Sequence, residues 1–574
     1  GLGDVYKRQV LSLAMIILVD LLIIFLTNSI RVGSVIVPFV LFIFAVVVCV
    51  VYEFRGIPMM APDILTVQTA TSVMGNYTFK LTFEQYSVIL VWMAFFFTFL
   101  RLHEVKVTEK RVFHIAGFIV VALGCGLFTN QIILSDFMEE HQINIRMFRP
   151  MESYQKYGGV LTFARSVGYA VVKKPEGYTT AKVDQIIQEY EKKSANEQQS
   201  TAKQYPNIIT VVNETFADIK VLGDFKTNED YMPYFHSLKK NCVTGYTYAS
   251  IVGGQTANTE FELLTGNTLG FLSAGTTAFQ LYIHGQMPSL VSNLKAEGYS
   301  GNKAMHPFNP YNYNRPAVYK DFGFTDFIDK FDFPKNVKRV REYISDEANV
   351  DRIISEYEKN RKKTDQPFYM YNMTIQNHSP YDKDAANFKQ PIKIESSKYD
   401  AEANRYLNLI KYSDDSLKQL TSYFEKCKEP TIILFLGDHQ PRLTDEFMNK
   451  ITNGQYQTWS SEQMMKRYQV PFVIWANYDI KGQHIEKTSM NYIQSILTQT
   501  AGVKMTGYQR FLNEVRKEVP TITSQGYWGK NGKFYQINDK GSPYYGIIQK
   551  YRMIQYNMMF DKKNRRDSFF EVSK

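Results

Sequence analysis

The sequence predicts an α-helical transmembrane N-terminal domain followed by an extracellular α/β domain, in which helices flank a mostly parallel sheet. Two observations support this prediction. Long apolar segments are confined to the part of the chain before residue 130. Beyond residue 205, β-branched strand candidates alternate with amphipathic helix candidates, which is the pattern of a parallel α/β sheet. At 574 residues, the chain is also long enough for two or three domains.

Four apolar runs are candidate membrane spans, because each approaches the roughly 20 residues that cross a bilayer. They begin at Val10, Val32, Tyr86 and Val112, and the third run is the shortest. A single run of this kind is compatible with a buried core helix. Four in succession, followed by a polar domain, indicate a membrane anchor, so we predict a transmembrane domain over residues 10–128.

The loop between the third and fourth runs sets the predicted orientation. It carries four basic residues, and basic loops stay on the cytoplasmic side of the membrane; they are Arg101, Lys106, Lys110 and Arg111. The domain after the fourth run is therefore expected outside the cell membrane of a multi-pass protein. Residues 1–9, GLGDVYKRQ, resemble a cloning remnant and are left out of the fold prediction, and an earlier span is expected to be missing.

Composition narrows the partners of the chain. The net charge of +10 favours anionic lipid surfaces or anionic substrates. The chain has neither a clustered basic stripe nor a nucleic-acid motif, so nucleic acid is not an expected partner. Of the four cysteines, Cys49 and Cys125 fall inside predicted spans. Cys242 and Cys427 fall in the outer domain, and their spacing leaves open whether they pair.

Three regions follow the predicted spans. Residues 129–205 are expected to form juxtamembrane helices and a charged, polar linker. Residues 206–506 carry the alternating strands and helices of the α/β domain. Residues 507–574 are rich in Tyr and Lys, and we expect them to form a small C-terminal subdomain.

Polar residues follow the hydrophobic strand candidates of the α/β domain. TIILFLGDHQ ends in Asp438 and His439, and IITVVNET ends in Glu214. Asp after Gly is ordinary turn chemistry, so GDH alone is compatible with a solvated turn. Because ligands collect at the carboxyl ends of parallel strands, however, we expect these three side chains to meet. Two carboxylates and an imidazole suit a divalent cation of the Mn²⁺ or Zn²⁺ kind.

A fourth polar group is expected in SIVGGQTANTEFELLTG, where Thr256 follows two glycines at the predicted start of a helix. Threonine is a common N-cap, and most such residues have no other role. A helix N-terminus is also a site for a phosphate group. A hydroxyl held there and bound to a metal has a lowered pKa and is able to attack phosphorus.

Five segments in this order resemble the lipoteichoic acid synthase family. They are NIITVVNETF, GGQTANTEFELLTG, MHPFNPYNYNR, QNHSPY and LFLGDHQP. The resemblance extends over nearly the whole chain, including the hydrophobic N-terminal block. It implies a membrane-anchored member of the alkaline phosphatase and sulfatase superfamily, with residues 206–506 as a sulfatase-like catalytic domain.

The resemblance also implies roles for individual residues. Glu214, Thr256, Asp438 and His439 match the metal ligands of the family, and Thr256 also matches its nucleophile. The residues that match the glycerophosphate-binding set are His306, Arg315 and His378, with Tyr313 where relatives often have Trp. Phe308 stands where some relatives have an acidic residue, so details of head-group recognition differ here. The implied cofactor is Mn²⁺, with Mg²⁺ and Zn²⁺ as alternatives.

The implied activity is a phosphoglycerol transfer from phosphatidylglycerol to a polyglycerolphosphate chain or a glycolipid acceptor, through a covalent Thr256 intermediate, with release of diacylglycerol. Four alternatives remain. They are a phosphoethanolamine transferase, a phosphoglycerol transferase that acts on a glycan, a sulfatase-like hydrolase, and a catalytically inactive receptor or scaffold. A sulfatase needs a modified Cys or Ser in a Cys/Ser-x-Pro-x-Arg segment, which GQTAN does not supply. A binding module has no need of a nucleophile at a helix start.

Overall fold

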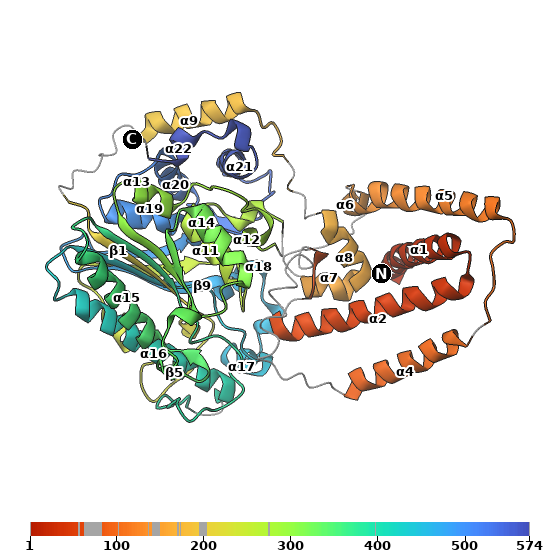
Figure 1. The fold of residues 1–574 in the computed structure, drawn as a ribbon, viewed down its shortest axis with the longest axis horizontal. Coiled ribbons are helices and arrows are strands. Elements are labelled where there is room, and N and C mark those ends of the chain that lie inside the picture. Colours follow the sequence, from red (N-terminus) through yellow and green to blue (C-terminus); the bar gives the residue numbers. More distant parts are fainter. Residues whose placement is uncertain are drawn as a thin grey trace. The chain divides into compact units, whose positions relative to one another are not determined.

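The computed structural model describes most of the chain, namely residues 2–55, 58–61, 83–101, 103–135, 137–140, 150–168, 172, 174–194, 204–273, 276–395 and 398–572. The chain divides into two compact units (Figure 1). The helical unit comprises Gly1–Val172 with Ser273–Thr276. The α/β unit comprises Lys173–Leu272 with Thr277–Lys574.

The helical unit is built from long apolar helices. Helix α1 packs against α2 and α5, and α2 packs against α4. The bounds are α1 Leu2–Thr27, α2 Ile30–Arg55, α4 Phe83–Leu100 and α5 Arg111–Phe128, which a π-helical turn extends over Thr129–Ile133. Residues 2–9, which the sequence analysis set aside, belong to α1 in the structure.

Three helices in the described part of the chain are long and apolar enough to cross a membrane, and they confirm a membrane-anchored protein. Their apolar stretches are Gln9–Thr27, Ile30–Tyr52 and Arg111–Ile133. The third predicted span corresponds to α4, whose apolar stretch Tyr86–Leu100 is shorter than these. Each of the four predicted runs thus lies on a helix, three of them of spanning length in the described residues, and the number of spans stays a prediction.

Short helices complete the helical unit: α6 Phe137–Glu140, α7 Pro150–Tyr157 and α8 Gly159–Gly168. They share a small buried cluster that includes Met138, Tyr157 and Leu161. The start of the predicted juxtamembrane segment continues α5 as the π-helical turn, because its apolar residues extend the apolar stretch of that helix. Residues 141–149 of this region lie outside the described part of the chain.

The α/β unit is centred on an eight-stranded sheet with the order β10-β2-β9-β8-β1-β7-β3-β4. Only β9 runs against its neighbours β8 and β2, so the prediction of a mostly parallel sheet is confirmed. The bounds are β1 Asn207–Asn213, β2 Cys242–Tyr248, β3 Ser300–Met305, β4 Asp326–Ile328, β7 Phe368–Met373, β8 Thr431–Gly437, β9 Gln469–Ala476 and β10 Gln483–Ser489. A short hairpin, β5 Arg339–Val340 and β6 Tyr343–Ile344, lies outside this sheet.

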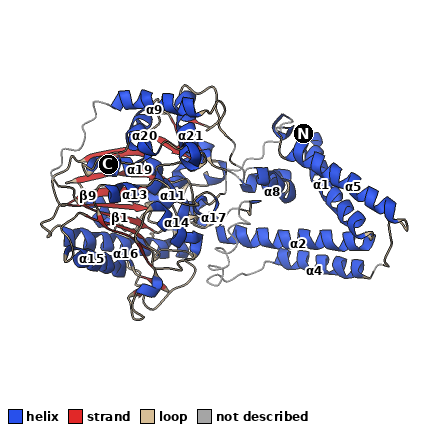
Figure 2. Ribbon diagram, turned by 45° about the horizontal axis from the view of Figure 1, so that its top comes forward, coloured by secondary structure: helices blue, strands red, loops and turns tan. Residues whose placement is uncertain are grey.

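Helices cover both faces of the sheet, which explains why the central strands β1 and β8 are buried at every position (Figure 2). One face carries α10 Pro233–Ser237, α15 Asp346–Arg361, α16 Ala401–Phe424 and α17 Asp445–Ile451. The other carries α11 Thr256–Thr265, α13 Leu290–Ala296, α14 Arg315–Phe322 and α19 Met490–Thr500. The shorter helices are α12 Ala278–Leu281 and α18 Ser461–Met464.

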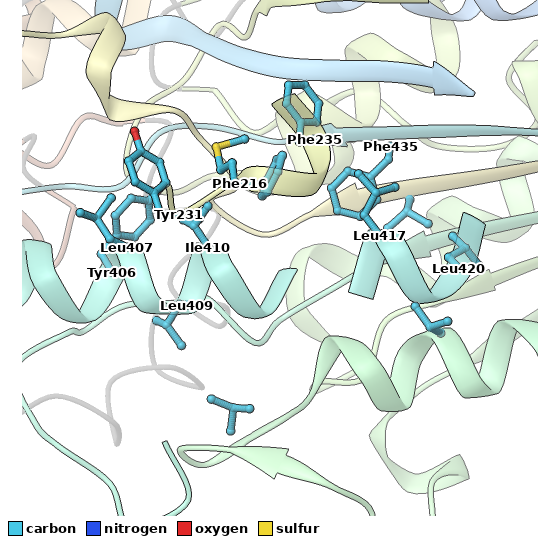
Figure 3. Close-up of a cluster of buried hydrophobic side chains, with 14 of the residues drawn as sticks. Phe216, Tyr231, Phe235, Tyr406, Leu407, Leu409, Ile410, Leu417, Leu420 and Phe435 are labelled. Atoms are coloured by element: carbon cyan, nitrogen blue, oxygen red, sulfur yellow. The ribbon is translucent and has the colours of Figure 1, made fainter. Parts of the chain in front are cut away.

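A cluster of aromatic and aliphatic side chains joins α16 to the sheet (Figure 3). Phe216 lies at its centre, with its ring 5.1 Å from that of Phe435 on β8 and 5.9 Å from that of Phe235 on α10. Both contacts are edge-to-face, an arrangement that aromatic quadrupoles favour, and Tyr406 of α16 makes a separate edge-to-face contact with Tyr381. This packing fixes the turn that follows β1.

The C-terminal residues pack on one edge of the main sheet through β10 and β11. They form α20 Gly507–Glu518, β11 Thr521–Thr523, β12 Gly526–Trp528, β13 Phe534–Tyr535, α21 Tyr545–Met559 and α22 Asp567–Phe570. Helix α9, Thr180–Ser194, packs on α20 and α21. Ion pairs join Glu189 to Lys550 at 2.7 Å and Asp184 to Arg566 at 2.6 Å. The polar stretch at 195–203 is outside the described residues.

Gly437, the last residue of β8, provides a test of this packing. A Cβ atom there would lie 1.9 Å from the backbone oxygen of Phe216, so Gly437→Ala must push β8 away from the turn after β1. We expect a loss of about 1–3 kcal/mol in unfolding free energy, as for other overpacked sites. Thermal unfolding of the detergent-solubilised protein measures it.

Gly546→Ala is the matched control, because a Cβ atom at Gly546 in α21 meets nothing within 4 Å. This change should leave stability unaltered or raise it by about 0.4–1 kcal/mol. Equal melting temperatures for the two variants would contradict the tight contact at Gly437.

Candidate active site

The pairing of β1 with β8 brings the two predicted acidic ligands together. The strands run parallel, and Asn213 is paired with Gly437 at their carboxyl ends. The next residue on each strand is therefore Glu214 or Asp438, and both side chains are buried. Adjacent parallel strands end at the same edge of a sheet, so the strand pairing alone brings Glu214 and Asp438 close together.

The two oxygens of Asp438 have different surroundings. Oδ1 accepts hydrogen bonds from the backbone N–H groups of Thr215, at 2.7 Å, and His439, at 2.8 Å. Oδ2 lies 3.2 Å from Nε2 of His439. Nδ1 of His439 is 3.0 Å from the Gln440 carbonyl oxygen, a contact that requires a proton on Nδ1. This contact selects the tautomer of the neutral ring in which Nε2 carries the lone pair that a metal ligand needs.

Glu214, Asp438 and His439 form the one cluster of metal-ligating groups identified in the described residues. One ligand atom from each lies within 4.8 Å of the others. Oε1 of Glu214 is 3.9 Å from Nε2 of His439, and Oε2 accepts a hydrogen bond from the Thr256 hydroxyl at 3.5 Å. Burial and the neighbouring Asp438 raise the pKa of Glu214 well above its usual value. The expected convergence of all four residues is thus observed.

Two atoms of this cluster show that a cation fits it. Oδ2 of Asp438 and Nε2 of His439 are buried and have no hydrogen-bond partner in the described structure. Two electron-rich atoms 3.2 Å apart are unfavourable in a buried site unless something positive lies against both. Two carboxylates, an imidazole and a hydroxyl suit a borderline or hard divalent cation.

Helix α11 presents the Thr256 hydroxyl to this cluster. Thr256 is the first helical residue, so the expected helix start is correct; the N-cap position belongs to Gln255, whose φ is 65°. Gly253 and Gly254 have φ of 70° and 146°, values that favour glycine. Thr256 is therefore not an N-cap. Its hydroxyl contacts Glu214 across the site rather than the backbone of its own helix.

Two hydrogen bonds attach α11 to the end of β8. The Thr259 hydroxyl donates to the Asp438 carbonyl oxygen at 2.8 Å. The Gly253 N–H donates to the Gln440 carbonyl oxygen at 2.9 Å. The first turn of the helix and the loop before it are thus both fixed to the residues that carry the ligands. Thr256 is held in place by the same strand end that supplies Asp438.

A buried polar network supports Glu214 from behind. Nδ2 of Asn377 donates to the Glu214 carbonyl oxygen at 3.0 Å and to Oδ1 of Asn213 at 3.1 Å. Asn213 in turn donates to Asp346 at 2.7 Å, and Ser413 donates to the same carboxylate at 2.6 Å. Burial raises the pKa of Asp346. Such networks orient ligands and are part of the site.

Both predicted substrate-binding histidines are held in the neutral form. Burial and the charge of Arg315 lower the pKa of His306 well below its usual value. Burial lowers the pKa of His378 to about 4, with Arg341 and His439 contributing. Nδ1 of His306 contacts the Met373 carbonyl oxygen at 3.0 Å, and Nδ1 of His378 contacts that of Ser379 at 2.7 Å. The two Nε2 atoms are then hydrogen-bond acceptors.

The guanidinium group of Arg315, at the start of α14, is held along one edge by hydrogen bonds and on one face by an aromatic ring. Its guanidinium donates from Nε and Nη2 to Glu260. The ring of Tyr313 lies against its face, with 5.1 Å from the guanidinium carbon to the ring centre. Tyr313 thus contacts Arg315, and its packing against a head group stays a prediction. The charge of Arg315 adds to the effect of burial in lowering the pKa of His306, and it offsets part of the rise in the pKa of Glu214.

Three supporting residues were not foreseen. Glu260 stands four residues after Thr256, and this spacing places both on one side of a helix. The sequence alone therefore allowed the prediction that Glu260 lies near the site. Asn377 belongs to the QNHSPY segment, but its hydrogen bond to Glu214 depends on the sheet order, which that segment does not reveal. Asp346 begins a helix far along the chain, and no local pattern links it to Asn213.

The sequence left open whether Cys242 and Cys427 pair, and in the structure both are free thiols.

The sheet and the strand-end cluster are those of the alkaline phosphatase and sulfatase superfamily of enzymes. The chain belongs to the sulfatase family: the model of that family matches residues 206–503, more than half of the chain. The α/β fold is shared with the phosphoglycerol transferase GacH of Streptococcus pyogenes, solved with sn-glycerol-1-phosphate. The TM-score is 0.57 at 21% identity, over 70% of this chain and 100% of that one.

Two relatives of known sequence are also similar. One, described as a "Putative cyclic beta-1,2-glucan modification protein" of Rhizobium meliloti, is 30% identical over 74% of this chain and 65% of its own length. The other, the lipoteichoic acid synthase-like YvgJ of Bacillus subtilis, is 27% identical over 41% of this chain and 36% of its own length. The chain thus spans less than two thirds of these relatives, and the resemblance to lipoteichoic acid synthases is confirmed.

Removing a ligand atom should weaken cation binding. Asp438→Asn or His439→Ala is expected to lower Mn²⁺ affinity roughly 10-fold or more, by analogy with other perturbed metal sites. The measurement is isothermal titration of the metal-stripped protein. His484→Ala changes an exposed histidine on β10 and should leave the affinity unchanged. Undiminished affinity in both site variants would mean that GDH is only a turn.

The helix that carries Thr256 also carries a carboxyl group that titrates near neutral pH. Glu262 is buried, and burial raises its pKa to about 7, although Ser250 and the Leu269 N–H donate to it at 2.7 Å and 2.8 Å. A raised pKa stabilises the fold below the unfolded value of 4.5, and this contribution is lost as pH rises through 7.

Glu262→Gln should remove this dependence. Between pH 6 and pH 8, the wild type should lose roughly 1 kcal/mol of stability relative to the variant. Melting temperatures at the two pH values measure the difference. Parallel changes in both proteins would show that Glu262 does not titrate in this range.

Proposed function

We propose that the protein is a metal-dependent phosphoglycerol transferase that acts at the outer face of the cell membrane. It takes glycerophosphate from phosphatidylglycerol, passes it to a polyglycerolphosphate chain or a glycolipid acceptor, and releases diacylglycerol. The observation that carries this proposal is the Thr256 hydroxyl at the start of α11, in contact with Glu214 of the metal-ligating cluster. A hydroxyl in this position is an activated nucleophile.

The comparisons support the choice of transferred group. GacH is a phosphoglycerol transferase by name and was solved with a glycerol phosphate. YvgJ is named for its likeness to lipoteichoic acid synthases. The membrane anchor agrees with a lipid donor, because the catalytic part of the chain stays tethered beside its substrate. The basic loop around Lys106 favours an outer location for the α/β unit, which agrees with an acceptor outside the membrane.

Glu214, Thr256, Asp438 and His439 would hold the cation, with Mn²⁺ preferred and Mg²⁺ or Zn²⁺ as alternatives. When bound, it supplies a lowered pKa at the Thr256 hydroxyl and charge neutralisation on the phosphate. Oγ1 of Thr256 attacks the phosphorus and loses its proton to solvent. The bond from phosphorus to the diacylglycerol oxygen breaks, and that oxygen takes up a proton. An acceptor hydroxyl then attacks the glycerophosphoryl-threonine and restores Thr256.

The residues around Thr256 bind the substrate in distinct ways. Arg315 offers planar donors that suit phosphate oxygens. His306 and His378 are neutral, with Nε2 as an acceptor, so each suits a hydrogen bond from a glycerol hydroxyl better than proton donation to the departing oxygen. This assigns them to head-group recognition and leaves the proton exchange to solvent.

A glycan acceptor is the second candidate. The relative from Rhizobium meliloti is described as a glucan modification protein, and its match covers more of this chain than the YvgJ match. Transfer to a glucan hydroxyl would use the same donor, the same threonine ester and the same cation. The two acceptors differ only in the second half of the reaction, so a product analysis separates them.

Thr256 provides the direct test. Thr256→Ala should abolish diacylglycerol release from fluorescent phosphatidylglycerol in the presence of Mn²⁺, because no other group forms the covalent ester. Mass spectrometry of wild-type enzyme quenched during turnover should find a glycerophosphoryl adduct on the peptide that contains GGQTANTEF.

Thr265→Ala is the matched control. Thr265 lies at the other end of α11, where its hydroxyl donates to the Phe261 carbonyl oxygen of the same helix. Activity should survive this change. If Thr256→Ala releases diacylglycerol at a rate comparable to the wild type, the covalent mechanism is wrong. Intact lipid with the wild type, for every donor offered, would favour an inactive receptor.

A further inference from the structure

Glu260 joins the nucleophile helix to the phosphate-binding arginine. It lies on α11 one turn after Thr256, and it is fully buried. Residues four apart lie on the same side of a helix, so Glu260 is placed beneath the reaction centre. A buried carboxylate is costly unless it is paired and hydrogen-bonded, so its contacts must account for its presence.

The Glu260 carboxylate accepts four hydrogen bonds. Oε1 accepts from Nε and Nη2 of Arg315, at 3.1 Å and 2.7 Å. Oε2 accepts from the hydroxyls of Tyr319 on α14 and Tyr371 on β7, the latter at 3.1 Å. Burial and the Glu260 charge raise the pKa of both tyrosines well above 10, so both remain protonated donors. One carboxylate thus connects α11, α14 and β7.

Because Glu260 neutralises the guanidinium, Arg315 adds little net charge to the site and acts mainly as an oriented hydrogen-bond donor. Glu260 cancels its positive charge within a buried region, where both side chains are at most 2% exposed. Nη1 takes no part in the pairing, and the ring of Tyr313 covers the guanidinium face. Rotation of the guanidinium is therefore blocked on one edge and one face, which leaves Nη1 oriented for an acceptor such as a phosphate oxygen.

We propose that Glu260 is a positioning residue for the transfer reaction. It holds the Arg315 guanidinium at a fixed place relative to Thr256, because both the hydroxyl and the carboxylate belong to one turn of α11. A phosphate group bound by Arg315 is thereby presented to the Thr256 hydroxyl. Small displacements of a reacting group have large effects on rate, so this alignment matters for turnover as well as for binding. The inference rests on the proposed function.

A double-mutant cycle separates positioning from simple structural support. The four proteins are wild type, Glu260→Gln, Arg315→Gln and the double variant. The measurements are binding of sn-glycerol-1-phosphate with Mn²⁺ present, and kcat and KM for phosphatidylglycerol. Glu260→Gln alone should weaken glycerol phosphate binding and kcat/KM roughly 10- to 100-fold, the range seen for partners that orient metal ligands. In the Arg315→Gln background, the same change should alter them less than about twofold.

Glu262→Gln is the matched control, since Glu262 is a buried glutamate two residues further along α11 and accepts hydrogen bonds from Ser250 and Leu269 rather than from Arg315. It should leave glycerol phosphate binding within about twofold of the wild type. If Glu260→Gln fails to fold, Tyr371→Phe replaces it in the cycle. That change removes one donor to Glu260 without altering charge, and it should reduce kcat/KM only when Arg315 is present.

The outcomes are distinct. A wild type that neither binds glycerol phosphate nor releases diacylglycerol would overturn the proposed function. A functional wild type with an unimpaired Glu260→Gln variant would overturn the positioning role alone. Equal losses from Glu260→Gln with and without Arg315 would also overturn it, because the glutamate would then act independently of the arginine.

Discussion

The parallel pairing of β1 with β8 is the constraint on which the site depends. Because Asn213 faces Gly437, the residues that follow, Glu214 and Asp438, leave the sheet at the same point. The Thr215 N–H then closes onto Asp438, and α11 is attached through Thr259 to the Asp438 carbonyl oxygen. A shift of one residue in this register would direct one of the two carboxylates to the opposite face of the sheet.

This arrangement has an energetic cost that the surrounding polar groups reduce. Glu214 and Asp438 are buried side by side, and burial together with the neighbouring charge of Asp438 raises the pKa of Glu214. Hydrogen bonds satisfy one oxygen of Asp438 and support the Glu214 backbone through Asn377, but Oδ2 of Asp438 has no hydrogen-bond partner among the residues that the structure describes. The geometry thus stores an unfavourable contact that a divalent cation relieves. Preorganised sites of this kind bind strongly and lower stability when empty.

The sequence predicted the strand ends well because they depend on local pattern. A buried strand that stops at Gly-Asp-His or at Asn-Glu is visible without knowledge of the sheet order, and the ordered motifs added Thr256. The partners of these residues were not predictable in the same way. Asp346 reaches Asn213 across 133 positions of sequence, and Tyr371 reaches Glu260 across 111. The reversed direction of β9 also has no local signal, since its residues are as apolar as those of β8. The apolar runs located the helices of the N-terminal part but not their ends, since α1 begins at Leu2, before the first apolar run.

The residues of the candidate site lie partly at the ends of buried strands and partly in exposed loops, and these two locations differ in how freely they can change. The metal-ligating residues are attached to β1, β8 and α11, where a change would disturb the sheet itself. The loops after β3 and β4 are different. Phe308 stacks on His378, Lys330 lies 5.9 Å from the Phe308 ring centre, and Tyr311 and Phe331 are 78% and 73% exposed. Loops tolerate substitution far better than buried strands. Under the proposed function, these loops are therefore where we expect acceptor choice to vary, while the proposed chemistry at Thr256 depends on the strand ends.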